Sequence, residues 1–224
     1  MSKTIDDPAR APAHEVRTLR SELAEFRAEV SGDSVKVSGY ASVFNEIADI
    51  GGYFREVVRP GAFTAALERG DDAQFLIGHR DLPLARVASG TLRLTQDDKG
   101  LRMETELDAS DPDVARIVPK MKRGDLTKMS FGFTIRPDGE QRWVDKGDEE
   151  TELREIISVG RLYDVSIVPE PAYAGTDIAL RSLEAFRAER GDAPAVQALE
   201  ARALWRKNQL GLMARQIGKR SRDR

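Results

Sequence analysis

The chain has 224 residues, a length that fits one ordinary domain with appended segments. It contains no cysteine, which excludes disulfides, zinc–thiolate sites and a cysteine nucleophile. The formal net charge of -3 argues against a generally basic nucleic-acid-binding domain. No apolar stretch approaches the roughly 18–20 residues needed to span a bilayer, and no hydrophobic signal region is visible, so we expect a soluble protein.

The N-terminal segment, residues 1–32, begins with prolines and charges that predict a flexible start. Apolar residues then recur at three- and four-residue spacings, at Val16, Leu19, Leu23, Phe26 and Val30. This spacing predicts an amphipathic helix that ends at residues 31–33. The helix could dock on its own domain or on a partner.

From Val35 the apolar period changes to two, which is typical of strands. Residues 92–107 alternate around a turn at 97–100, a hairpin with a glycine at the position that favours positive φ. Further strands are predicted at 127–136, 152–158 and 162–168. Short helices are expected after Pro60 and from the N-cap Asp111 to Gly124. Residues 33–180 are therefore predicted to form one β-rich α+β core domain.

Residues 181–224 are predicted to form a helical, basic C-terminal extension. An apolar seam runs through part of it, and its last residues, from Gly218 on, are basic and without apolar content. The two ends of the chain are thus expected to serve assembly.

Two residues carry the candidate chemistry, His79 and Ser130, which lie about fifty residues apart, each at the end of an apolar run typical of a strand. A serine nucleophile needs a general base within hydrogen-bond reach and a group that orients this base. The second histidine, His14, is expected to be exposed to solvent. No spacing typical of metal ligands occurs, so we expect no metal and no cofactor.

The chain resembles the prohead (head maturation) proteases of tailed phages with HK97-type capsids. Six segments carry the resemblance in the family's order, between about residues 35 and 180. They are 39–45 (GYASVFN), 54–63 (FREVVRPGAF), 75–81 (FLIGHRD), 89–94 (SGTLRL), 129–133 (MSFGF) and 162–168 (LYDVSIV).

The resemblance implies a serine endopeptidase with His79 as base and Ser130 as nucleophile. It also points to Asp164 as the residue that orients the base, although family members more usually carry glutamate there. Glu155 on the neighbouring predicted strand is the substitute candidate, and Asp81 is a further one. The implied fold is a closed antiparallel β-barrel similar to herpesvirus assemblin, flanked by short helices and with helical extensions at both ends.

The resemblance further implies where such a protein acts. It would lie inside the viral prohead in the host bacterial cytoplasm, and it would cleave scaffold or the scaffolding domain of the major capsid protein precursor, and itself. Self-association is possible, whereas membrane and nucleic acid are not expected as partners. The alternative is a non-catalytic virion or scaffold module that keeps the fold and binds capsid protein.

Overall fold

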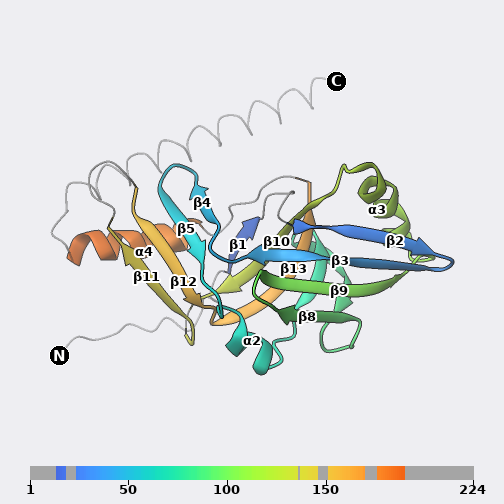
Figure 1. The fold of residues 1–224 in the computed structure, drawn as a ribbon, viewed down its shortest axis with the longest axis horizontal. Helices are drawn as coiled ribbons and strands as arrows, with labels where there is room; N and C mark the ends of the chain where they lie inside the picture. The colour runs from blue at the N-terminus through green and yellow to red at the C-terminus, as the bar shows by residue number, and fades with distance from the viewer. Residues whose placement is uncertain (1–13, 19–23, 136, 146–150, 170–175, 190–224) are drawn as a thin grey trace, which may run out of the picture. The chain divides into compact units, whose positions relative to one another are not determined.

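The computed structural model describes residues 14–18, 24–135, 137–145, 151–169 and 176–189. Within these ranges the core is built from three sheets with short helices beside them (Figure 1). The predicted α+β, β-rich class is therefore confirmed. No helix in the described ranges is both long and apolar enough to cross a bilayer.

The first sheet has the strand order β1-β10-β13-β6-β7. Its strands are β1 (Glu15–Thr18), β10 (Lys128–Thr134), β13 (Arg161–Val168), β6 (Gln74–Ile77) and β7 (Arg80–Arg86). The β13–β6 pair is parallel and the other neighbours are antiparallel. β10 and β13 are central and almost wholly buried, which explains their nearly continuous apolar runs.

The second sheet has the order β2-β3-β9-β8 and is antiparallel throughout. Its strands are β2 (Arg27–Ser31), β3 (Ser34–Val43), β9 (Gly100–Asp108) and β8 (Leu92–Gln96). The predicted hairpin at residues 97–100 is confirmed, since it joins β8 to β9. There Asp97 accepts hydrogen bonds from the backbone N–H groups of Lys99 and Gly100.

The third sheet has the order β11-β12-β5-β4. Its strands are β11 (Glu140–Val144), β12 (Leu153–Ser158), β5 (Phe54–Val58) and β4 (Ile47–Ile50). β12 runs parallel to β5, whereas the two outer pairs are antiparallel. β5 thus brings Glu56, a residue from early in the chain, beside Arg154 of β12.

One apolar core joins residues from all three sheets and from helices α2 (Thr64–Glu68) and α3 (Pro112–Arg123). Aromatic rings link its parts, because Phe63 contacts both Phe44 and Phe131. The predicted limits of α3 are confirmed: Asp111 accepts a hydrogen bond from the Asp113 backbone, and Gly124 ends the helix in the left-handed conformation. A further helix, α4 (Thr176–Glu189), follows β13.

The helix predicted across residues 16–30 is wrong for residues 16–18 and 27–30. Residues 15–18 and 27–31 are strands, and the predicted helix stop at 31–33 is instead the tight turn of the β2–β3 hairpin, with Gly32 at a φ of +58°. The three- and four-residue spacing of apolar residues suggested a helix only because it runs across two short strands. Val16 is buried against β10, whereas Val30 lies exposed on an edge strand.

A closed barrel was also predicted. Among the described residues the hydrogen-bonded pairings form three separate sheets, and none of these pairings closes them into one ring. The C-terminal residues 190–224, with the whole predicted apolar seam and the basic end, lie outside the described residues. The division at 32 and 180 stays a prediction.

Candidate active site

His79 stands in a two-residue turn between β6 and β7, where Ile77 pairs with Arg80. Gly78 and His79 both have positive φ, at 63° and 62°. This is the backbone of the hairpin turn whose twist matches that of its flanking strands. For a histidine the left-handed region is uncommon, so the turn holds His79 in a conformation that the flanking strands must impose. The Gly78 N–H donates to the Ile167 carbonyl of β13, which fixes the turn against the sheet.

Ser130 lies on β10 and faces the His79 ring. Its Oγ is 2.6 Å from His79 Nε2, and the residue is wholly buried. Ser130 pairs with Thr18 of β1 on one side and with Ser166 of β13 on the other. Ser130 therefore lies inside the sheet, between two strands from distant parts of the sequence.

Asp164 of β13 lies on the other side of the imidazole. Its Oδ1 is 2.6 Å from His79 Nδ1, and the carboxylate is almost completely buried. The carboxylate accepts from the ring N–H when Nδ1 carries the proton, which leaves Nε2 free to accept from the serine. The three residues named from the sequence thus meet in one hydrogen-bonded chain from carboxylate to imidazole to hydroxyl.

Gly132 makes room for this carboxylate. It pairs with Asp164 across β10 and β13, and a Cβ added to it would lie 2.2 Å from Asp164 Oδ2. Any side chain at this position would therefore displace the carboxylate or the strand. The glycine of the MSFGF segment has a local packing reason to be there.

Ser166 is a polar neighbour that the sequence analysis did not single out. Its hydroxyl donates to Asp164 Oδ1 over 2.7 Å and lies 3.2 Å from His79 Nδ1. The residue is wholly buried and pairs directly with Ser130. Its only sequence signal is the two-residue spacing from Asp164, which places both side chains on one face of a strand.

Glu155, the substitute candidate, has other partners. It lies on β12 in a different sheet and forms ion pairs with Arg59 and Arg142. The hydrogen bond from Arg59, opposed in part by burial, helps hold the pKa of this carboxyl below its ordinary value. The hydrogen bonds of Glu155 thus go to arginines and not to the imidazole.

Of the two other residues named from the sequence, His14 lies near the Asp164 carboxylate, because a Cβ added to Gly132 would meet both His14 Cδ2, at 3.3 Å, and Asp164 Oδ2, at 2.2 Å. His14 is exposed, and its ring lies 5.4 Å from that of Tyr163. Asp81 lies on β7, two residues after His79, and its side chain is outside the described part of the structure. Neither observation links these residues to Ser130.

A buried cluster of four charges lies where β1 meets the third sheet. Arg17 donates to Glu56 and to Glu15, and Arg154 donates to both of these carboxylates. Burial opposes ionisation of Glu56, but Arg17 and Arg154 together hold its pKa below the ordinary value. Two acids and two bases balance, so this cluster is an electrically neutral unit inside the protein.

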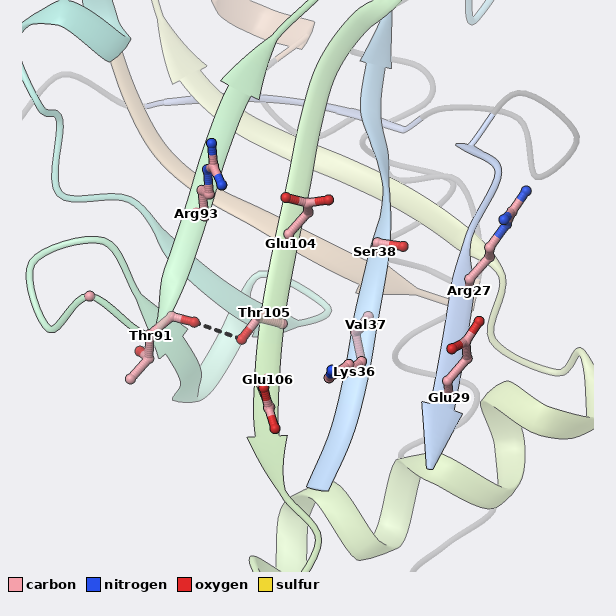
Figure 2. A pocket seen from close by; sticks show the side chains of 11 residues that line it. Arg27, Glu29, Lys36, Val37, Ser38, Thr91, Arg93, Glu104, Thr105 and Glu106 are labelled. Atoms are coloured by element: carbon pink, nitrogen blue, oxygen red, sulfur yellow. Dashed lines mark hydrogen bonds between the residues drawn. The ribbon is translucent and has the colours of Figure 1, made fainter. Parts of the chain in front are cut away.

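A separate hollow lies on the outer face of the second sheet (Figure 2). It is lined by side chains of β2, β3, β8 and β9, with three acidic and three basic residues among them. The acidic residues are Glu29, Glu104 and Glu106, and the basic ones are Arg27, Lys36 and Arg93. None of the residues of the hydrogen-bonded chain borders it. Among the described residues no group of three or more acidic or histidine side chains could hold a metal ion.

A serine hydroxyl, an imidazole and a buried carboxylate in this order form the constellation of serine peptidases and related hydrolases. A family model described as caudovirus prohead serine protease matches residues 22–189, which is most of the chain. The chain belongs to this family. The matched range includes all three residues of the constellation.

One curated relative is the prohead protease of Enterobacteria phage HK97. The two chains are 29% identical over 126 residues, which are 55% of this chain and 52% of the relative. The chain thus aligns with about half the length of the curated relative it matches. No solved structure matches the chain.

Proposed function

We propose that this protein is a serine endopeptidase of phage procapsid maturation, with Ser130 as nucleophile, His79 as general base and Asp164 as the residue that orients the base. One observation carries the proposal: the two ring nitrogens of His79 each lie 2.6 Å from an oxygen, one of Ser130 and one of Asp164. Family membership supports the reaction type.

The mechanism follows from this geometry. Ser130 Oγ bonds to the carbonyl carbon of the scissile peptide while its proton passes to His79 Nε2. The C–N bond then breaks, and His79 returns the proton to the departing amine. Water attacks the acyl-enzyme next and gives its proton to His79, which passes it to the Ser130 oxygen as the acyl bond breaks. Asp164 stays ionised throughout and stabilises the imidazolium.

An aspartate stands where the family more usually carries glutamate, and the structure offers a reason why it suffices. β13 holds Asp164 opposite Gly132, the position where β10 presents no side chain. The carboxylate can therefore sit close against β10 and still reach Nδ1. This supports Asp164 over Glu155, whose oxygens are engaged by arginines.

The proposed substrates are scaffold or the scaffolding domain of the major capsid protein precursor, together with the protease itself. The name of the relative, prohead protease, supports an assignment to the prohead interior in the infected bacterium. The assemblin-like barrel implied by the resemblance remains a prediction, as does self-association.

Co-expression of the protein with its capsid precursor, followed by mass spectrometry, tests the proposal. We expect cuts in the precursor that disappear with Ser130→Ala and persist with Ser42→Ala, a buried serine of β3 in another sheet. Processing by the Ser130→Ala protein would overturn the assignment. A folded wild-type protein that binds the precursor but never cuts it would favour the non-catalytic module.

A further inference from the structure

The short strand β1 lies over Ser130 and accepts its hydrogen bond. β1 pairs antiparallel with β10 along four residues, from Glu15 opposite Phe133 to Thr18 opposite Ser130. Ser130 Oγ donates to the Arg17 carbonyl oxygen over 2.8 Å. Ser130 is wholly buried with β1 in place, so a nucleophile that must reach a peptide is covered by a piece of its own chain.

The hydrogen bond to Arg17 also competes with the proposed chemistry. A hydroxyl has one proton, which can point to His79 Nε2 or to the Arg17 carbonyl but not to both. When it points to Arg17, the serine is not hydrogen-bonded to its base as a donor. β1 therefore lies where a substrate strand would lie, and its Arg17 carbonyl accepts the proton that Ser130 must give to His79.

Two side chains of β1, Glu15 and Arg17, form specific ion pairs with the rest of the protein. Glu15 and Arg17 are two residues apart, so they project from the same face of an extended strand. Arg154 Nη1 and Nη2 bind Glu15 over 2.6 and 2.8 Å, and Glu56 accepts from Arg17 Nε and Nη2 over 2.5 and 3.0 Å. The Arg17 guanidinium also lies 5.7 Å from the centre of the Phe133 ring.

The remaining surface is complementary to this pair. Glu56 and Arg154 also bind each other over 2.9 Å, so that removal of β1 would leave one acid beside one base. A strand that enters with an acidic residue, any residue and then a basic residue restores the neutral four-charge cluster. A strand with the two charges exchanged would place like charges together in a buried site.

We propose that β1 occupies the substrate-binding groove as a built-in competitor, and that the groove takes an extended peptide with an acid–x–base sequence as an added antiparallel strand beside β10. Glu56 and Arg154 are the specificity-determining residues, for the base and the acid of the peptide respectively. This inference rests on the proposed peptidase function, because it names the peptide that the same site accepts.

Peptide binding to a protein that cannot cut tests the groove apart from the chemistry. The full chain with Ser130→Ala is compared with the full chain that also carries Glu15→Ala and Arg17→Ala, and Glu15→Gln with Arg17→Gln is the milder second variant. The probe is a fluorescent peptide of residues 11–20, read by fluorescence anisotropy. Its comparison peptide carries Glu15→Arg and Arg17→Glu. Thermal unfolding shows that each protein is folded.

We expect the probe to bind the variants without the β1 charges at least about tenfold more tightly than it binds Ser130→Ala alone, because the internal competitor is weakened. The charge-exchanged peptide should bind about 100-fold more weakly than the probe. The matched control is Arg102→Ala with Glu104→Ala, a base–x–acid pair on β9, which should leave binding as in Ser130→Ala.

Equal affinity for both peptides, or no gain when the β1 charges are removed from either folded variant, would overturn the inference. The proposed function fails in a different way, by the absence of Ser130-dependent cuts in the capsid precursor. Charge-selective binding without such cuts would support the groove and contradict the peptidase. Ser130-dependent cuts together with equal binding of both peptides would support the peptidase and contradict the groove.

Discussion

Asp164 and Glu155 are both buried carboxylates on neighbouring segments of the chain, yet their partners differ. Asp164 on β13 contacts an imidazole and a hydroxyl. Glu155 on β12 contacts two arginines, which lower its pKa against the opposing effect of burial. Burial alone therefore does not mark a catalytic carboxylate. What distinguishes the two is whether the partner can exchange a proton near neutral pH.

The largest difference between Asp164 and Glu155 should appear when the charge of each is removed in turn. Asp164→Asn keeps the shape but removes the acceptor that fixes the ring tautomer, and should lower kcat/KM by about 10³–10⁴-fold. Glu155→Gln should lower it less than about tenfold, since its effect on the imidazole is indirect. Both are measured on one peptide substrate, and the opposite ranking would give the orienting role to Glu155.

Gly132→Ala should displace the Asp164 carboxylate without removing any charge. The new Cβ would lie 2.2 Å from Asp164 Oδ2, so the carboxylate must move and its bond to His79 must lengthen. We expect a loss of about 100-fold in kcat/KM, in line with the cost of small misplacements at active sites. Gly39→Ala is the control, because the Cβ of this β3 residue would also be crowded, at 3.0 Å from the Ala24 carbonyl oxygen, but in another sheet. If both variants lose stability and only stability, Gly132 has no positioning role.

Ser166→Ala tests the second donor to Asp164. The loss of one hydrogen bond to the carboxylate is worth about 1 kcal/mol, so kcat/KM should fall by about five- to tenfold. The pH profile of kcat/KM is the deciding measurement: a positioning hydroxyl should shift its acidic limb, whereas lost packing would lower stability and leave the limb in place.

Sequence reasoning succeeded where chemistry and local pattern coincide. The Asp111 cap and the hairpin at 97–100 follow from short-range rules, whereas His79, Ser130 and Asp164, which the structure brings together, were named through the family resemblance. It failed for residues 15–18 and 27–31, because a helical period can arise by chance from two strands. Ser166, Gly132 and Arg17 were missed, since their roles depend on strand pairings that join distant segments. No local sequence feature of β1 indicates that it pairs with β10.

The smallest expected effect concerns the acid stability that Glu155 provides. Its folded-state pKa is lowered by the hydrogen bonds and charges of Arg59 and Arg142 against an opposing burial effect, so the unfolded chain takes up its proton first as pH falls. The stabilisation is complete above the unfolded pKa of about 4.3 and is lost as pH falls through the lower folded value. Glu155→Gln should therefore lower stability at pH 7 by about 1–2 kcal/mol, and the difference from wild type should shrink below about pH 4. Denaturant unfolding between pH 3 and 7 measures it. A difference that stays constant over this range would mean that Glu155 acts through its shape and not its charge, and the contrast with Asp164 would lose its electrostatic basis.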